Sequence, residues 1–454
     1  MRYARDLPLT HEVDVIVAGG GTAGVMAAVA AARAGARTVL VERHGFLGGC
    51  AVFGATSLHC FFNIFKKEPR VPEKQVVRGL AQELVDRLMA RGGSLGHVEM
   101  ERGYDFVSRL TLSDPEDYKL AAQEMVAEAG VDLLLHTYVA DVLAGEGRIE
   151  GLVAASKSGL EILRAKVYVD ATGDGDLAAG AGARFTDIRG AENPYGVSLT
   201  FRLTHVDLER AAAAFDRAGA LWQLARAVKP GRSGPEIVRL GGHLRPWREE
   251  IEEAGLNWWF FANSVRPDEF TYVNATWIHP ADPVDRDDLT RCELAARRQV
   301  HRTVEFLRRR IDGFADATLA ATMPQIGTRR SRVVETLYEL AREDVLRGRG
   351  FPDEVARFSF IDNPDYFVAG GGSYGIPYRC LVPRGVSNLL VAGRMISSDL
   401  VVHNSTRNTV CCMAQGQAAG VAAALCAASG LRPDKLDPAV LRDRLAEQGA
   451  YFES

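Results

Sequence analysis

The segment "HNSTRN" (403–408) contains the residue types that most directly suggest chemistry. His403 could move a proton near neutral pH, because an unperturbed imidazole titrates at about pH 6.5. Arg407 could polarise a substrate oxygen or orient the surrounding loop. His59 and Tyr374 are further candidates for proton transfer on the same grounds. A buried histidine with satisfied hydrogen bonds is the structural alternative for His403.

The elements that must position these residues begin with a glycine turn near the N-terminus. Residues 13–18, "VDVIVA", have the character of a short buried strand. The turn "GGGTAG" follows, with Gly19, Gly21 and Gly24 in G-x-G-x-x-G spacing, and an Ala-rich helix comes next. Such glycines let the backbone approach a pyrophosphate closely, and the helix N-terminus adds amide donors and partial positive charge. This context predicts a dinucleotide site.

A carboxylate at the end of the next strand supports the same interpretation. The strand "RTVLVE" (37–42) closes on Glu42. A carboxylate about 20 residues after the glycines can accept hydrogen bonds from an adenosine ribose, and it disfavours a 2′-phosphate. A second match, "GGGSYG" (370–375), is followed by Pro377, which excludes a helix there, so we interpret it as a loop. A second tightly bound nicotinamide dinucleotide is therefore not expected.

The composition excludes several classes of protein. The chain has 454 residues, a net charge of −4, 47% hydrophobic residues and 25% charged residues. We therefore expect two or three globular domains and no nucleic-acid binding. No run of about 18 apolar residues is evident, so no membrane span is expected, and the cytoplasm is the default location. The seven cysteines form no C-x-x-C pair and fit reduced thiols, and no metal-ligand spacing appears.

Three further segments favour FAD over NAD as the dinucleotide. They are "AKVYVDATGDGDLA" (165–178), "SNLLVAGRMISSD" (387–399) and a helix of small residues within 401–430. With these segments the sequence resembles the bacterial FAD_oxidored family of FAD-dependent oxidoreductases, relatives of the fumarate reductase and succinate dehydrogenase flavoproteins. The resemblance covers roughly 12–60, 115–185 and 320–430. It implies an α/β fold: a Rossmann-like FAD-binding domain of the glutathione-reductase-like type, with an inserted α+β substrate domain.

The resemblance also implies a role for individual residues. The glycine turn would hold the pyrophosphate, Glu42 the adenosine ribose, and Val139 would meet the adenine through its backbone. Residues 172–174 would close over the dinucleotide, and 393–394 would border the ribityl chain. The helix that starts near Asn408 would point its N-terminus at the flavin and stabilise negative charge on the reduced ring. The full set of implied cofactor-binding residues is Gly19, Gly21, Thr22, Ala23, Gly24, Glu42, Arg43, Gly48, Gly49, Cys50, Val139, Ala171, Thr172, Gly173, Asp174, Gly393, Arg394, Arg407 and Asn408.

Cys50 follows a glycine pair, Gly48 and Gly49, that would let the chain pass close to the flavin ring. Relatives often carry a small or hydroxyl residue after this pair, so the thiol is a departure. Three roles stay open. Cys50 packs as a small hydrophobic residue, bonds covalently to the flavin, or acts as a redox thiol, for example with Cys60. We expect non-covalent FAD, with the covalent link at Cys50 as the alternative.

Residues 188–365 break the pattern of the flanking segments, and we interpret them as the inserted substrate domain between two FAD-binding parts, 1–187 and 366–454. All five tryptophans fall in this insert. The segment "NWWFFANS" alternates like a strand, whereas 208–228 and 287–312 are interpreted as amphipathic helices. The aromatic residues either grip an apolar or ring-shaped substrate or form the core of the insert.

A cluster of arginines follows a glycine turn in "MPQIGTRRSR" (323–332). Relatives have an arginine-containing segment here that approaches the active site. Because an arginine fork can pair with a carboxylate through two hydrogen bonds, one of Arg329, Arg330 and Arg332 is predicted to hold an acidic substrate, with Arg329 as the first candidate. Structural salt bridges are the alternative.

We therefore expect an enzyme in which a hydride moves between FAD and a small organic substrate, cyclic or acidic, while a proton moves through His403 or a nearby group. The electron acceptor could be oxygen, a quinone, a carrier protein or NAD(P), and a homodimer is the default assembly. One alternative is a thiol/disulfide flavoprotein that uses Cys50 with Cys60 or the vicinal pair 411–412. The other is flavin-dependent modification of a macromolecule or carrier.

Overall fold

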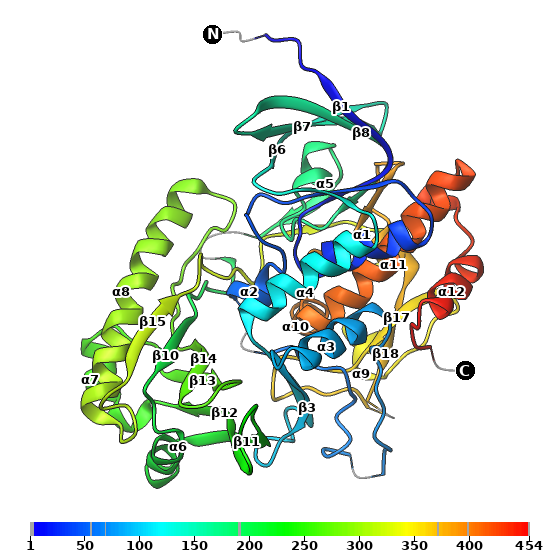
Figure 1. The fold of residues 1–454 in the computed structure, drawn as a ribbon. Helices are drawn as coiled ribbons and strands as arrows, with labels where there is room; N and C mark the ends of the chain where they lie inside the picture. The colour runs from blue at the N-terminus through cyan, green and yellow to red at the C-terminus, as the bar shows by residue number, and fades with distance from the viewer. Residues whose placement is uncertain are drawn as a thin grey trace.

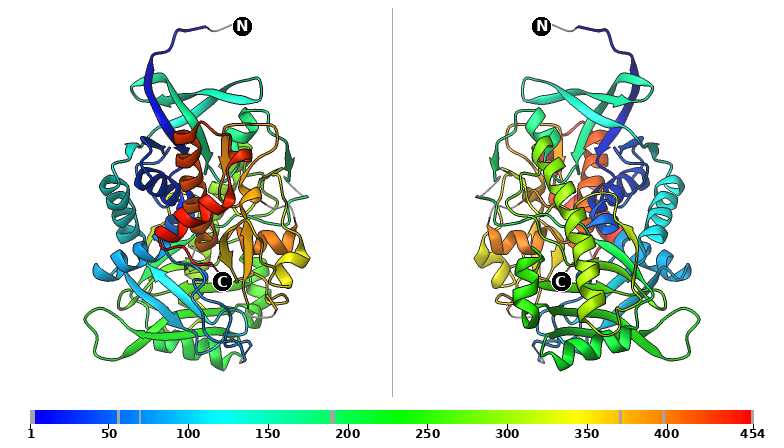
Figure 2. Two further views of the ribbon diagram at one scale, coloured as in Figure 1. Left: turned by 90° about the vertical axis from the view of Figure 1, so that its right-hand side faces the viewer. Right: turned by 90° about the vertical axis from the view of Figure 1, so that its left-hand side faces the viewer.

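The structure, a computed structural model, contains two large β-sheets, each with its own hydrophobic core. The first sheet lies at the top and the second at the bottom of both views in Figure 2, and helices pack against each of them (Figure 1). The structure describes residues 4–54, 57–68, 70–188, 192–369, 372–396 and 399–452. The predicted fold class, an α/β cofactor domain with an inserted α+β domain, is confirmed.

The first sheet is parallel at its centre. In spatial order its strands are β5 (Asp132–Leu134), β2 (Thr38–Val41), β1 (Leu9–Ala18), β8 (Gly159–Asp170), β7 (Arg148–Ser156) and β6 (Tyr138–Gly145), with β19 (Leu389–Val391) paired to β8. Ala18 on β1 and Val391 on β19 are both register partners of Asp170 on β8, so the carboxyl ends of three parallel strands meet. Ligands of open α/β sheets bind at this edge.

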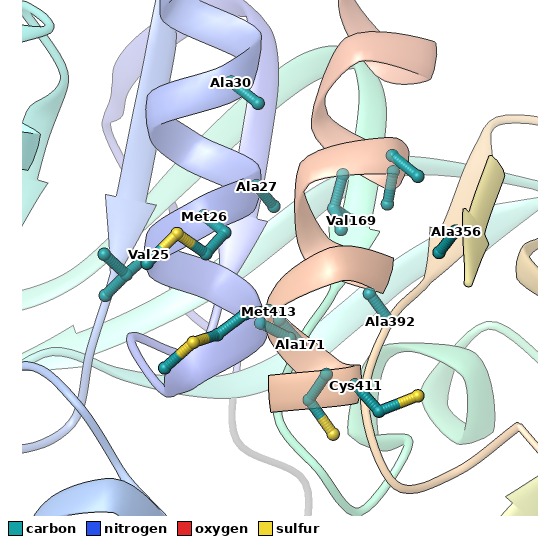
Figure 3. Close-up of a cluster of buried hydrophobic side chains, with 14 of the residues drawn as sticks. Val25, Met26, Ala27, Ala30, Val169, Ala171, Ala356, Ala392, Cys411 and Met413 are labelled. Atoms are coloured by element: carbon teal, nitrogen blue, oxygen red, sulfur yellow. The ribbon is translucent and has the colours of Figure 1, made fainter. Parts of the chain in front are cut away.

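Helices α1 (Thr22–Arg33) and α11 (Thr409–Ser429) pack closely side by side (Figure 3). A Cβ on Gly416 would lie 2.1 Å from the carbonyl oxygen of Ala23, and one on Gly420 would lie 2.1 Å from that of Ala27. Both contacts advance by one helical turn in the same direction, so the two helices run parallel. Their N-termini therefore lie at the same end, the carboxyl edge of the first sheet.

The apolar composition of α11 has a structural explanation. By length and composition this helix could cross a membrane, which differs from the expectation that no such run exists. In the structure, however, 89% of its most apolar stretch is buried inside the protein. Its polar Gln415 accepts a hydrogen bond from the Gly393 amide and donates one to the Thr406 carbonyl. The helix is thus a core element that packs against α1 and the first sheet.

The second sheet is antiparallel, and its two faces differ. In spatial order its strands are β11 (Leu221–Val228), β12 (Pro235–His243), β13 (Trp259–Asn263), β14 (Glu269–Asn274), β10 (Phe201–Thr204) and β15 (Thr318–Thr322). On β13, Phe260 packs into the second core, which also takes side chains from α6 (Leu208–Arg217) and α8 (Arg286–Arg310). Trp259 and Phe261 point to the opposite face, as strand alternation requires.

The helix expected over 208–228 is wrong beyond Arg217. Gly219 adopts a φ of +65° after the end of α6, and 221–228 form β11 instead. β11 pairs along its length with β12, so tertiary context outweighs the helical pattern of the Ala-rich sequence. The helix expected over 287–312 is confirmed as α8.

The second core takes its residues mainly from 197–326, whereas hydrophobic residues of 334–361 pack in the first core. The chain thus returns to the first unit earlier than the predicted insert, 188–365, because β16 pairs with β9 and β17 with β18. The remaining elements are α2 (Cys50–Phe53), α3 (Leu80–Ala90), β3 (Ser94–Glu99), β4 (Arg109–Ser113), α4 (Pro115–Glu128), α5 (Asp176–Gly180), β9 (Phe185–Asp187), α7 (Arg248–Glu253), β16 (Arg332–Val334), α9 (Arg342–Leu346), β17 (Glu354–Phe358), β18 (Tyr374–Pro377), α10 (Leu400–Thr406) and α12 (Pro438–Glu447). The expected loop at 370–375 partly lies outside the described residues, since Gly370 and Gly371 are not described, and β18 begins at Tyr374.

Candidate active site

A large cavity extends from the carboxyl edge of the first sheet to one face of the second sheet. This face, to which Trp259 and Phe261 point, is called the free face of the second sheet. Its volume is about 1040 Å³, at the upper end of the ~300–1,000 Å³ typical of small-molecule sites. The predicted cofactor-binding residues all line it except Gly24 and Gly48. The cavity can therefore hold an extended cofactor and a substrate together.

Glycine is required in the first turn for two different reasons. Gly19 has a φ of +96°, and a Cβ on Gly24 would lie 1.7 Å from the carbonyl oxygen of Gly19, so the local backbone excludes side chains at both positions. Gly21 has an ordinary φ of −73°, and a Cβ there would meet only the Cα of Gly49, at 4.0 Å. The space beside Gly21 is thus open to a ligand. Gly21 also caps α1 without a side-chain hydrogen bond, so the helix amides are available to a phosphate.

Glu42 lies directly after β2 and is buried at the cavity wall. Its Oε2 accepts a hydrogen bond of 2.6 Å from the Gly20 amide, and its Oε1 accepts one of 2.8 Å from the His44 amide. These bonds fix the carboxylate against the glycine turn. A carboxylate has about four lone-pair sites, so it can still accept hydrogen bonds from ribose hydroxyls.

The opposite wall is built by the residues after β8 and β19. Arg394 donates a hydrogen bond of 2.5 Å from Nη2 to Oδ1 of Asp174, and Ser331 donates to the same oxygen. A Cβ on Gly173 would lie 2.5 Å from Nη1 of Arg394, so the glycine makes room for the guanidinium. The Nε of Arg394 is buried and has no hydrogen-bond partner among the described residues. A buried cationic donor beside the phosphate turn fits a pyrophosphate.

The glycine pair before Cys50 allows the chain to pack closely against the glycine turn 19–24, which is called the phosphate turn. Gly48 has a φ of +113° and Gly49 a φ of +48°, a region that side chains rarely adopt. The Gly48 amide donates to the carbonyl oxygen of Gly20, and a Cβ on Gly49 would lie 2.8 Å from the Cα of Gly21. The pair is therefore required for close contact between two backbone segments. Cys50 then starts α2 at the cavity surface.

The N-terminus of α11 opens on the same cavity. Asn408 is its N-cap, but the Asn408 side chain donates to the carbonyl oxygens of Asn404 and Ser405 rather than capping the helix amides. Thr409 and Cys412, in the first turn, line the cavity. The uncapped amides and the helix dipole give this wall a positive potential.

Three of the predicted catalytic residues line the cavity beyond this point, namely Arg407, Arg329 and His59. Arg407 pairs with Asp362, and Arg329 donates to the Gly196 carbonyl and the Ser198 hydroxyl. His59 stacks on Phe360 and has an Nδ1 that is buried without a hydrogen-bond partner among the described residues. These three side chains are available to a ligand.

His403 and Tyr374, in contrast, do not line the cavity. His403 is fully buried, and its Nε2 lies 3.0 Å from the Arg329 carbonyl oxygen. Burial holds the pKa of His403 well below its usual value, so the imidazole is neutral. Tyr374 is also fully buried and donates to the Ser405 hydroxyl. Their positions outside the cavity indicate a structural role in holding α10 and the Arg329 segment in place, although the buried Nδ1 of His403 has no hydrogen-bond partner among the described residues.

The thiols are arranged differently from the predicted pair. Cys60 is buried away from the cavity, where its Sγ donates to the Arg109 carbonyl, and burial raises the pKa of this thiol to about 12. Cys411 does not line the cavity either. Cys412 does, together with Cys50. Any thiol chemistry in this cavity would therefore involve Cys50 and Cys412.

The second sheet supplies the tryptophans that the sequence analysis singled out and three polar residues that it did not. Four of the five tryptophans line the cavity, and Trp247 packs against the second core. Gln223, Arg239 and Asn274 line it as well. Arg239 stands within the apolar run of β12. A buried arginine in a strand needs a specific partner or ligand, so this pattern could have identified Arg239 from the sequence.

Neutral buried histidines predict acid sensitivity. Burial lowers the pKa of His59 and of His97 to about 4. As pH falls from about 6.5 towards 4, the unfolded chain binds protons that the folded chain does not, so stability decreases, by up to about 3 kcal/mol per histidine. We expect the melting temperature to fall through this range and the fall to be smaller in His97→Gln. His301→Gln, at an exposed position on α8, is the control; equal slopes for His97→Gln and wild type would contradict this cause.

Comparison with known proteins agrees with this geometry. A sequence model of the FAD dependent oxidoreductase family matches residues 14–445. Thiamine thiazole synthase from Pyrococcus horikoshii is 27% identical over 185 residues, 39% of this chain and 64% of that protein. Digeranylgeranylglycerophospholipid reductase from Methanoculleus marisnigri is 27% identical over 169 residues, 36% of this chain and 39% of that protein. The matched region thus spans less than two thirds of either relative.

A solved structure supports the fold. The flavin-dependent brominase Bmp2 superposes with a TM-score of 0.50 and 13% identity, covering 95% of this chain and 83% of that one. At this identity the likeness shows the fold alone. The predicted family, its enzymatic nature and its cofactor, FAD, are confirmed, while the narrower glutathione-reductase-like class stays a prediction. The match over nearly the whole length places this chain in the FAD dependent oxidoreductase family.

Proposed function

We propose that this enzyme transfers a hydride between the flavin and a small organic substrate held against the second sheet. The observation that carries the proposal is the single cavity that joins the phosphate turn, the N-terminus of α11 and the free face of the second sheet. FAD supplies the hydride chemistry when it is bound, and the protein supplies orientation and electrostatics.

The cavity divides naturally into a cofactor end and a substrate end. Gly21 with the N-terminus of α1 would hold the pyrophosphate, Glu42 the adenosine ribose, and Arg394 a phosphate oxygen. The uncapped amides of α11 would face the flavin end, where negative charge develops on reduction. Residues of the second sheet then line the remaining space.

Among the predicted proton-transfer candidates, His59 is the one placed to act on a substrate. It lines the cavity, and burial, with a further effect of Arg239, lowers its pKa to about 4. At pH 7 the imidazole is neutral and has a free lone pair, although a pKa this far below 7 makes it a weak base. Its Nε2 lies 2.7 Å from the Ser57 hydroxyl, and stacking on Phe360 fixes the ring, so the unpartnered Nδ1 has a defined direction.

The state of the flavin tests the proposal directly. We expect the purified protein to show the visible spectrum of oxidised flavin, and we expect that flavin to pass a filter after denaturation, because FAD is held by the non-covalent contacts above. Cys50→Ser should then bind FAD in the same amount. Flavin that stays with the wild-type chain but leaves Cys50→Ser would show a covalent link instead. A protein that neither contains nor binds FAD would refute the function.

Turnover is tested on the same preparation under anaerobic conditions. Loss of the oxidised flavin band on adding an organic donor, or its return after chemical reduction on adding an organic acceptor, is the expected result. Oxygen, a quinone, a carrier protein and a nicotinamide are then supplied in turn to the reduced enzyme to identify the physiological electron partner.

A thiol/disulfide reaction is the second candidate, because Cys50 and Cys412 line the same cavity. Burial raises the pKa of Cys412 to about 12, which keeps it protonated and makes it a weak nucleophile. Cys412→Ser separates the two functions: a hydride enzyme keeps its turnover, whereas a dithiol enzyme loses it.

A further inference from the structure

The substrate end of the cavity has a composition that points to one class of ligand. We call it the substrate chamber and define it by Trp222, Trp258, Trp259, Trp277, Arg239, Arg329 and Arg407. Four indole rings and three guanidinium groups line this part of the cavity. This combination is unlike the ordinary core of a sheet, where arginine is rarely buried.

The tryptophans form a continuous wall. Trp222 and Trp258 are edge to face at 5.5 Å, Trp258 and Trp259 at 5.3 Å, and Trp259 and Trp277 at 5.1 Å. Each ring is thus held by its neighbour, which keeps the wall rigid. A shift of register between Leu221 and Gln223 on β11 brings both Trp222 and Gln223 to the cavity side. Such a wall favours a flat or ring-shaped apolar group.

The guanidinium groups lie beside this wall. Arg329 sits over the ring of Trp277 at 4.9 Å, and both of its recorded hydrogen bonds go to neutral oxygens. Arg407 packs over Tyr195, pairs with Asp362 and lines the cavity. Arg329 and Arg407 therefore offer donors to an anion at the edge of the aromatic wall.

The charged side chains of the substrate chamber indicate how many negative charges the ligand carries. Arg407 pairs with Asp362, whereas the hydrogen bonds of Arg329 go to a carbonyl and a hydroxyl oxygen. No carboxylate among its described hydrogen-bond partners therefore balances the charge of Arg329. Burial, reinforced by Arg407, also lowers the pKa of Arg329 to about 10, which reflects the unfavourable confinement of these cations. A single negative charge would balance the chamber, whereas a phosphate dianion would overshoot.

We propose that the substrate of this enzyme is a ring-bearing monocarboxylate, with its ring on the tryptophan wall and its carboxylate paired with Arg329 and Arg407. The planar fork of arginine matches a carboxylate through two hydrogen bonds. His59 lines the same space and is placed to exchange a proton with the substrate. The redox role rests on the proposed function, but the binding preference can be measured without turnover.

The test is a binding titration of the FAD-loaded protein with four compounds. Phenylacetate has the ring and the single charge, phenylacetamide lacks the charge, acetate lacks the ring, and phenyl phosphate carries a second charge. Quenching of tryptophan fluorescence and a shift of the flavin band report binding. We expect phenylacetate to bind at least about 10-fold more tightly than each of the others, since one unmatched charged hydrogen bond or lost aromatic contact costs that much.

Substitutions in the substrate chamber test which residues bind phenylacetate. Arg329→Gln and Arg407→Gln should each weaken phenylacetate about 10- to 100-fold and leave phenylacetamide unchanged. Trp259→Ala should weaken phenylacetate but not acetate. Arg309→Gln, exposed on α8, and Trp247→Phe, at the second core, are the matched controls. Flavin content and melting temperature show whether each variant is folded, and Arg329→Lys, which keeps the charge but not the fork, should recover only part of the affinity.

The outcomes separate this inference from the proposed function. Equal affinity for phenylacetate and phenylacetamide, tighter binding of phenyl phosphate, or no effect of either arginine variant would overturn the monocarboxylate assignment. If a neutral compound turned over while carboxylates did not bind, the hydride function would stand and this inference would fail. If phenylacetate bound as expected but no compound changed the redox state of the flavin, this inference would stand and the hydride function would fail.

Discussion

Gly420→Ala should destabilise the protein by about 2 kcal/mol, although alanine is the better helix former. The added methyl would lie 2.1 Å from the Ala27 carbonyl oxygen, so α1 and α11 must move apart. Overpacking of this kind costs about 1–3 kcal/mol and occasionally more, while the gain in helix propensity is about 1 kcal/mol. Because both helix N-termini line the cavity, flavin content should fall with the melting temperature. Thermal unfolding and the flavin-to-protein ratio measure the two effects.

Two comparisons make this prediction specific. Gly416→Ala should behave in the same way. The double variant should lose less stability than the two single variants added together, because one separation of α1 and α11 accommodates both methyl groups. Gly234→Ala, whose Cβ would meet nothing within 4 Å, is the control and should be neutral. A Gly420→Ala protein with unchanged melting temperature would show that the helices are not packed as closely as described.

Gly21→Val should remove FAD while leaving the fold intact. The backbone of Gly21 suits any residue, and no protein atom lies closer than 4.0 Å to its missing Cβ, so the valine side chain fills the ligand space beside the N-terminus of α1. We expect FAD affinity to fall about 100-fold, the equivalent of ~3 kcal/mol of steric conflict. Titration of the cofactor-free protein with FAD gives the affinity, and circular dichroism reports the fold.

The neighbouring glycine provides the contrast. Gly24→Ala places a methyl 1.7 Å from the carbonyl oxygen of Gly19, so this variant should lose both fold and cofactor. Gly234→Val, at a position where no atom lies within 4 Å of the missing Cβ, is the control for added bulk. If Gly21→Val bound FAD as tightly as wild type, the pyrophosphate could not lie where the turn predicts.

The cofactor half of the site could be read from the sequence because each signal there is local. The turn after β1, Glu42 after β2, the polar turn after β8 and Gly393 after β19 each follow the apolar end of a strand, and parallel strands bring such ends together. The start of α11 was likewise marked by Asn408 before a run of small residues. The structure places all of these segments at the cavity.

The substrate half could not be read in the same way, because it depends on register and on helix rotation. Trp222 reaches the cavity through an irregularity in β11, a segment that the sequence pattern assigned to a helix. His403 and Asn404 are neighbours on α10, yet only Asn404 lines the cavity. Successive helical side chains differ by about 100° in direction, so closeness in sequence to a functional helix does not place a side chain in the site.

Parallel packing of α1 and α11 also affects how this protein depends on its cofactor. Each helix N-terminus carries roughly half a positive charge, and parallel neighbours bring two such ends together without compensation from an opposing dipole. FAD would offset that repulsion with its pyrophosphate at α1 and its flavin at α11, a pair of contacts that only the folded chain can make. By mass action, free FAD at about 100 times its dissociation constant would add ~2.7 kcal/mol to the stability of the fold. The supply of FAD in the cell would then help to set how much of this enzyme is folded at all.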